Sequence, residues 1–248
     1  MQFNTDGIIL KVQQTGEADR IVTILTRDRG IIRAFAKGAK RPRHRLHAGT
    51  GLLCYANLSV FRSPKDVYSV NEAEVVEIFF GLRDNIEKLS LAHYFCELAT
   101  LFSPEGDSAE EQLRLILNSL FMLEKDRRPP LMLKAIMELR LMTAAGYMPN
   151  LVACDNCGAY ESPTMYFQIN EGRLLCGNCP PKGGAVALPL ALVNAMRHIA
   201  FTEMKELYQF SLPDGCYAQL ADVTEQFLRS RISHPFATLD FYKSSAAF

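Results

Sequence analysis

The chain has 248 residues, of which 48% are hydrophobic and 22% charged, and its formal net charge is zero. This composition is typical of a globular chain of one to three modules with a real core, and it excludes attraction to nucleic acid by overall charge. No uncharged run is long enough to span a bilayer, and the N-terminus lacks the features of a signal peptide, so we expect a cytoplasmic protein without membrane contact. Seven cysteines in such a chain indicate thiols or metal binding rather than disulfides.

The first 80 residues are predicted to be all-β. They carry 12 Lys and Arg against 8 Asp and Glu, so the basic character of the chain is local to this module. Five segments rich in Val, Ile, Thr, Phe and Tyr are bounded by turn signals and predict strands over residues 3–12, 20–26, 30–37, 52–62 and 66–78. Five short strands with the longest connection after the third favour a small closed barrel of the OB type, with a sandwich or an SH3-like barrel as the alternative.

A basic stretch links the third and fourth predicted strands. Alternation places Ile32, Ala34 and Ala36 on one side of the third strand and Arg33, Phe35 and Lys37 on the other. A flexible basic loop is then expected, and no acidic residue lies between Arg29 and Asp66. An aromatic ring among cations can stack a base while the cations meet phosphates. The candidate nucleic-acid-binding residues are therefore Arg33, Phe35, Lys37, Lys40, Arg41, Arg43 and Arg45, unless the loop is only a solvated surface.

From residue 81 to 146 apolar residues recur every three or four positions, which predicts three helices separated at 103–106 and 128–130. His93 on such a stripe is expected to be a buried imidazole rather than a ligand. Two more helices are predicted over 189–201 and 214–231, closing the same bundle. The chain is thus expected to be an α+β multidomain protein, with an OB-type barrel at 1–80, a helical domain at 81–150, an inserted zinc ribbon at 151–186 and C-terminal helices completing the helical domain at 187–248.

Two cysteine pairs give the strongest motif in the chain. Cys154 and Cys157 are separated from Cys176 and Cys179 by 18 residues, a four-cysteine zinc spacing, and a β-hairpin predicted between the pairs brings them together. Gly158 and Gly177 are expected to allow the left-handed turns of such a site. Four thiolates leave no open position, so one structural Zn²⁺ ion is expected, with an iron–sulfur cluster or a redox pair as weaker alternatives.

The other sequence signals favour no catalytic chemistry. Cys54, Cys96 and Cys216 lie in apolar contexts and are expected to be small core residues. The chain contains no phosphate-binding loop, no dinucleotide-binding glycine motif and no zincin motif. Acidic pairs such as Glu110 and Glu111 are expected to be solvated. We therefore predict that the protein is not an enzyme.

Several segments together carry a family resemblance. They are GIIL near the start, GEADRIVTILTRDRGIIRAFAKGAKRPRHRL, MELRLMTAAGYMPNLVACDNCG leading into the second CGNC pair, and PFATLDF. Over nearly its whole length the chain resembles RecO, the family of bacterial recombination mediators. The resemblance implies an OB domain, a helical domain and a zinc ribbon. It also implies a nucleoid-associated DNA repair protein that binds single- and double-stranded DNA, anneals complementary strands, and acts with RecR to help load RecA onto DNA coated by single-strand-binding protein.

Three other functions stay open at this point. In a zinc-ribbon transcription or RNA-associated factor the ribbon would touch nucleic acid, but between Cys154 and Cys179 Arg173 is the only basic residue, against Asp155, Glu161 and Glu171. That balance disfavours this alternative. A metal-dependent hydrolase acting on DNA would need a specific carboxylate site. A scaffold protein would carry the basic loop incidentally.

Overall fold

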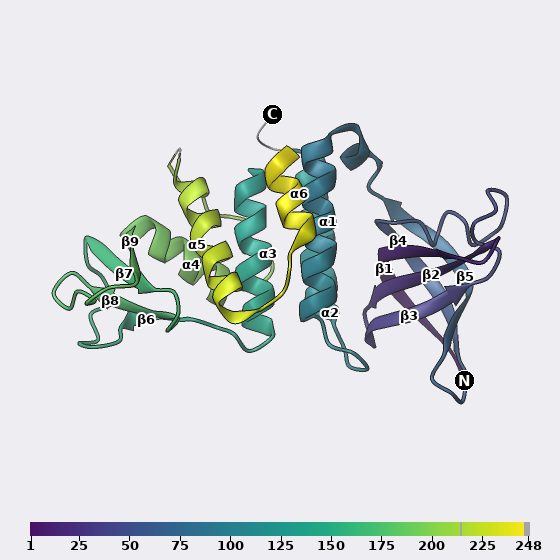
Figure 1. Cartoon of the computed structure of the whole chain (residues 1–248), viewed down its shortest axis with the longest axis horizontal. Helices are drawn as coiled ribbons and strands as arrows, with labels where there is room; N and C mark the ends of the chain where they lie inside the picture. The colour runs from purple at the N-terminus through teal and green to yellow at the C-terminus, as the bar shows by residue number, and fades with distance from the viewer. Residues whose placement is uncertain (214, 246–248) are drawn as a thin grey trace. The chain divides into compact units, whose positions relative to one another are not determined.

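Alternating apolar and polar residues in the first 78 residues build five strands, as predicted. The computed structural model describes residues 1–213 and 215–245 (Figure 1). The strands are β1 (Gln2–Thr15), β2 (Asp19–Thr26), β3 (Gly30–Ala36), β4 (Cys54–Arg62) and β5 (Tyr68–Ile78). They close into a barrel in the order β1-β2-β3-β5-β4, in which only the β3–β5 pair is parallel. This arrangement confirms the predicted OB-type fold.

The barrel core consists of small and branched side chains from every strand. Val22 pairs with Ala34 and Ile24 with Ile32 across β2 and β3, and all four are buried. β1 is buried on both faces, because Ile9 belongs to the barrel core while its fully buried neighbour Ile8 lies on the opposite side of the strand, where α1 contacts β1. Burying one such side chain stabilises the fold by about 1.5–3 kcal/mol.

The helical part begins with a short 3₁₀ helix. The elements are η1 (Phe80–Asp84), α1 (Ile86–Phe102), α2 (Glu110–Glu124), α3 (Pro130–Ala144), α4 (Leu190–Phe201), α5 (Cys216–Arg231) and α6 (Ala237–Ser245). The five predicted helices are confirmed, although Asp214, the first residue of the last one, lies outside the described residues. The helix α6 is not predicted from the sequence. No helix in the described part of the chain is long and apolar enough to cross a membrane.

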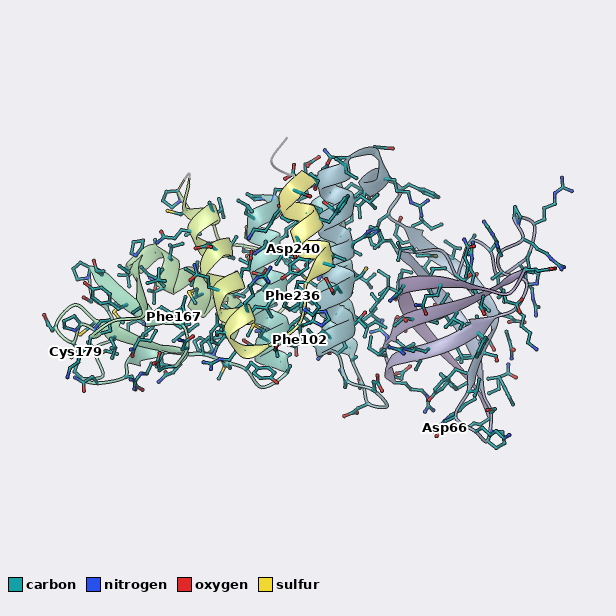
Figure 2. The ribbon with its side chains drawn as sticks, viewed as in Figure 1. Asp66, Phe102, Phe167, Cys179, Phe236 and Asp240 are labelled. Atoms are coloured by element: carbon teal, nitrogen blue, oxygen red, sulfur yellow. The ribbon has the colours of Figure 1, made fainter. Side chains whose placement is uncertain are left out.

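Contacts divide the chain into two compact units, Met1–Lys125 together with the segment from Phe236, and Asp126–Pro235. In the first unit α6 returns to pack on α1 (Figure 2), where the Phe236 ring meets Tyr94 edge-on at 6.1 Å. Thr238 on α6 donates a hydrogen bond to Glu97 on α1. By contacts, α1, α2 and α6 belong with the barrel, and α3, α4 and α5 belong with the small sheet. This grouping differs from the domain ranges expected from the sequence, and those ranges stay a prediction.

Within the first unit, the β2–β3 turn is bonded to the loop between α1 and α2. The backbone N–H of Ile31 donates to the carbonyl oxygen of Pro104 at 2.8 Å, and that of Ala109 donates to Arg27 at 2.8 Å. Gly30 has φ +60°, and a Cβ atom there would lie 1.9 Å from the Pro104 oxygen. Only glycine fits this close approach. The barrel and the first two helices are therefore joined by backbone hydrogen bonds as well as by side chains.

The second unit packs α3 and α5 together beside a small sheet. The sheet contains β6 (Asn150–Cys154), β7 (Thr164–Gln168), β8 (Arg173–Cys176) and β9 (Ala185–Pro189), in the order β6-β8-β7-β9. Phe167 on β7 meets the Phe227 ring of α5 at 5.6 Å. Between α3 and α5 the Lys134 ammonium is buried, 2.8 Å from Glu138 and 3.0 Å from Glu225. This unit is thus held together by an apolar core with an ionic centre.

Candidate nucleic-acid interface and metal centre

The outer face of β3 has the predicted alternation. Ile32, Ala34 and Ala36 are buried in the barrel, whereas Arg33, Phe35 and Lys37 are exposed. The Phe35 side chain is 38% exposed, which is unusual for an aromatic residue in the middle of a strand. The strand therefore presents an aromatic ring between two cations to solvent.

The segment between β3 and β4 is folded against the barrel. The sequence predicts a flexible loop here, but the structure shows consecutive turns whose apolar residues, such as Ala39 and Leu46, are buried in the barrel core cluster. The backbone N–H of Gly38 donates to the Asp19 carboxylate at 2.8 Å, and that of Lys40 donates to the Ala18 carbonyl at 2.9 Å. The cations of the loop therefore project from a fixed backbone.

Two further features hold this loop in place. The Arg20 guanidinium donates to the His47 carbonyl at 2.9 Å and to the Thr50 hydroxyl at 3.2 Å. Gly38 has φ +71°, and a Cβ atom there would lie 2.9 Å from the His44 ring. Burial lowers the pKa of Arg20, although a guanidinium stays protonated in proteins. Arg20 has a structural role that the sequence analysis missed, because its partners lie 27 and 30 residues away.

The side chains of this region form a surface that we call the basic surface. Its members are Arg33, Phe35, Lys37, Lys40, Arg41, Arg43 and Arg45, and all seven are exposed. Within the described part of the chain only Arg45 has an acidic partner, Glu72 at 4.0 Å, and both side chains are largely exposed, so that pair is weak. Because the other five cations have no acidic partner within the described residues, a bound polyanion can neutralise them.

A groove that meets the basic surface at Glu72, the partner of Arg45, is lined by carboxylates. Asp6, Asp28, Glu72 and Glu74 line a hollow of about 460 Å³ over β1, β4 and β5. Asp6 is paired with the Arg27 guanidinium at 2.7 Å, and this hydrogen bond, followed by that from Tyr55, lowers the pKa of the Asp6 carboxyl although burial opposes it. The carboxylates of this groove would repel a polyanion, so the barrel surface has regions of opposite charge.

The four predicted cysteines come together in the second unit. Cys154 ends β6 and Cys176 ends β8, and all four Sγ atoms lie within 4.8 Å of one another. Figure 2 labels Cys179 among the loops beyond the sheet. A tetrahedral ion with Zn–S bonds of about 2.3 Å holds its sulfurs about 3.8 Å apart. The 3.6 Å separation of the Cys157 and Cys176 Sγ atoms fits this spacing, so the cluster can hold a metal ion.

The local backbone explains how the sulfurs converge. The predicted β7–β8 hairpin is confirmed, and Gly158 has φ +74°, as the prediction of a left-handed turn requires. The same prediction is wrong for Gly177, which has no positive φ; its N–H instead donates to the Ser162 hydroxyl at 3.3 Å. The Asn156 side-chain amide donates to the Cys179 sulfur at 3.2 Å. This donor favours a thiolate at that position.

The pKa values of the cysteine thiols also favour a bound cation among the four sulfurs. Burial raises the pKa of Cys154, but backbone N–H groups of Cys157, Cys176 and Asn156 outweigh it and lower that pKa to about 6. The Ala159 N–H lowers the pKa of Cys157, yet hydrogen bonds with the other three thiols raise it to about 12. Four crowded sulfurs cannot all ionise without a positive charge among them, and a divalent ion would supply that charge.

Arg197 on α4 anchors the β6–β9 sheet, which we call the cysteine sheet, to its helix. The sequence analysis misses this residue. Its buried guanidinium donates to the carbonyl oxygens of Leu151 at 2.7 Å, Val152 at 3.0 Å and Tyr160 at 2.7 Å. It also lies 4.0 Å from the centroid of the Tyr160 ring. These carbonyls flank the first cysteine pair, so Arg197 positions the chain on both sides of it. A single arginine on an apolar helix gave no sequence signal of this role.

The remaining candidates are structural residues. Cys54 and Cys96 are buried, and burial raises the pKa of these thiols to about 11 and about 12 respectively, which confirms the prediction of core positions. Cys216 is only half-buried, so that prediction holds in part. The His93 ring is half-buried on α1, and burial lowers its pKa. None of the three thiols belongs to the cysteine cluster.

Comparison with known proteins covers almost the whole chain. Residues 1–79 match the family model "Recombination protein O N terminal" and residues 83–240 match "Recombination protein O C terminal". A protein of Acetivibrio thermocellus named DNA repair protein RecO is 36% identical over 98% of this chain and 96% of its own length. Proteins with the same name from Symbiobacterium thermophilum and Dehalococcoides mccartyi are 31% and 32% identical, over 96% and 79% of this chain and 96% and 78% of their own lengths.

Proposed function

Because this chain belongs to the RecO family of DNA repair proteins, we propose that it is a recombination mediator whose basic surface binds single- and double-stranded DNA. In this proposal the protein anneals complementary strands and helps load a recombinase onto DNA coated by single-strand-binding protein. Its partners are DNA, RecR and single-strand-binding protein, and it acts on RecA indirectly, at the nucleoid. It does this without catalysis by its own residues.

The observation that carries the proposal is the cluster of exposed cations around Phe35. Annealing brings two polyanions together, so the protein must neutralise phosphates on both strands. Six exposed cations on β3 and the loop that follows it can do this without reading base edges, which suits any DNA sequence. The fixed backbone of the loop supports the proposal further, because little conformational entropy is lost when its side chains meet phosphates.

The cysteine cluster has a structural role in this proposal. We assign it one Zn²⁺ ion held by Cys154, Cys157, Cys176 and Cys179, since four thiolates suit this ion and leave no ligand position for water. Bound zinc would neutralise the thiolates and lock the two turns together. The chain's own residues do the rest, with Asn156 donating to one sulfur and Arg197 holding the neighbouring carbonyls.

The test compares wild type with the triple variant Lys40→Glu, Arg41→Glu, Arg43→Glu, by affinity for a labelled single strand of mixed sequence. We expect the wild-type affinity to fall steeply between about 0.05 and 0.2 M salt, and the log–log slope of the variant to be shallower by about 2 to 3. The same proteins would be assayed for duplex binding and for the annealing rate of complementary strands. Both activities should fall together.

A matched control reverses three exposed cations of the second unit, Arg127, Lys182 and Lys205. This control changes the net charge equally, so it isolates position from total charge. If the control lost as much affinity as the triple variant, binding would follow overall charge and the basic surface would not be the DNA site. Equal affinity of wild type and triple variant would point to the scaffold alternative.

A further inference from the structure

A concave site borders the basic surface at one end of the barrel. Its volume is about 440 Å³, within the range of small-molecule sites, and its lining belongs entirely to the first compact unit. The lining contains two arginines, Arg20 and Arg83, and the imidazole of His47, but no acidic residue. His47 belongs to the same loop as the basic surface, so the site and that surface are continuous along the chain.

Phe80 gives this site an aromatic wall. Its side chain is 60% exposed, the second highest value after Met1 among the large hydrophobic residues that the structure describes. The guanidinium carbon of Arg83 lies 5.3 Å from the centroid of the Phe80 ring. The apolar floor includes Val12, Leu52 and Ile78. An exposed ring beside a cation, over an apolar floor, has the features that stack a nucleobase and meet its phosphate.

Arg83 is the cation best placed to meet a ligand. The donors of Arg20 bind the His47 carbonyl and the Thr50 hydroxyl, whereas the one hydrogen bond of Arg83 is a long one, 3.4 Å to the Leu52 carbonyl. Within the described residues no carboxylate forms an ion pair with Arg83. The nearby Glu124 accepts from the Gly81 N–H at 2.9 Å and pairs with Lys125 at 2.8 Å.

We propose that this site, which we call the Phe80 pocket, takes one unpaired base of a DNA strand bound on the basic surface. The base stacks on Phe80 and Arg83 meets the adjoining phosphate. A paired base is stacked inside its duplex and cannot enter, so the pocket contributes to single-strand binding and not to duplex binding. The inference rests on the proposed function and deepens it, since it gives one barrel a means to favour single strands.

The test measures affinity for a single strand and for a blunt-ended duplex of the same sequence, with Phe80→Ala and Arg83→Gln in the full chain. Loss of one stacking contact is expected to weaken single-strand binding about tenfold and leave duplex binding within about twofold. Phe80→Tyr, which keeps the ring, should retain wild-type affinity. A 2-aminopurine base in the strand should show a fluorescence change on binding that Phe80→Ala removes.

The matched controls are Phe201→Ala and Arg127→Gln, which alter an exposed ring and an exposed cation of the second unit. Unchanged single-strand affinity of Phe80→Ala, or an equal loss for the duplex, would overturn the proposal. So would an acidic peptide that binds wild type but not Phe80→Ala while single-strand affinity is unaffected, because the pocket would then be a peptide site. If wild type bound no DNA, the proposed function itself would fail, which is a different outcome.

Discussion

Cationic side chains occur in two opposite environments in this protein. On the barrel, Lys40, Arg41 and Arg43 are exposed and have no acidic partner within the described residues. In the second unit, Lys134 is 3% exposed and lies between two carboxylates, those of Glu138 and Glu225. The first arrangement leaves charge available to a ligand, and the second uses charge inside the fold. The difference shows that position and pairing, rather than the number of cations, determine which part of this neutral chain can bind a polyanion.

The largest expected effect is on the stability of the second unit, which contains the cysteine cluster. Replacing Cys154 and Cys157 with Ser should abolish bound metal and destabilise the second unit by several kcal/mol, since structural zinc contributes about 10 kcal/mol or more of apparent binding energy in small domains. Metal content by elemental analysis and unfolding by calorimetry would check this. DNA affinity should stay within about twofold. A folded variant that lost DNA binding outright would place the DNA site in the second unit and contradict its assignment to the basic surface.

Removing the buried Lys134 tests whether this cation stabilises the second unit. Lys134→Met removes the cation paired with the buried Glu138, whereas Glu225 keeps Arg229 at 3.2 Å, and should lower the free energy of unfolding by about 3–5 kcal/mol. Denaturant unfolding of the variant would measure it. The control is Lys205→Met, which removes an exposed cation paired with Glu203 and should change stability by less than about 0.5 kcal/mol. If both variants lost a similar amount of stability, burial would not explain the contribution of Lys134 to the free energy of unfolding.

The Asp6–Arg27 pair is an intermediate case. The hydrogen bond from Arg27 lowers the folded pKa of Asp6, so its contribution is present above the unfolded value of about 3.9 and is lost as pH falls through the folded pKa. Asp6→Asn should cost about 1 kcal/mol near pH 7, where the partly exposed pair is screened, and should flatten the loss of stability below about pH 4. Thermal unfolding across a pH series would show it. If the variant lost stability with falling pH as steeply as wild type, the acid sensitivity would not come from the Asp6–Arg27 pair.

The smallest expected effect is that of one exposed cation. Arg43→Ala should weaken single-strand binding about fivefold at about 0.1 M salt, because each neutralised phosphate contributes a slope of about 0.7. Titration against a labelled strand would measure this. Arg173→Ala removes an arginine of the cysteine sheet that is paired with Asp155 at 2.8 Å, and it should leave DNA affinity unchanged. A larger loss with Arg173→Ala would instead favour the ribbon as the nucleic-acid site.

Local patterns predict much of this molecule. The alternation of residues 31–37 predicts which side chains of β3 are exposed, since successive residues of a strand point to opposite faces. The spacing of the two cysteine pairs likewise predicts the cluster, because each tight turn brings its own two sulfurs together. In both cases the determining residues are close together along the chain.

Long-range partners explain what the sequence analysis misses. Lys134 and Glu138 are four residues apart on α3, which in a sequence is also the pattern of a solvated surface pair. The pair is buried because the Lys134 ammonium also contacts Glu225 and the Ala221 carbonyl of α5, which lie far away in the sequence. The folded course of the basic loop depends in the same way on Asp19 and Arg20, and the Phe80 pocket is formed by residues from Val12 to Arg83. Such contacts are not encoded in local periodicity.

The return of α6 to α1 has a consequence for the order of folding during synthesis. The first compact unit contains Tyr94, whose ring is covered by Phe236, so the ribosome must make the whole second unit before the first is complete. At about 5–20 residues per second this leaves the α1 surface without its covering helix for several seconds or longer. Nascent chains halted before residue 236 should therefore be more open to proteolysis around α1 than the released protein.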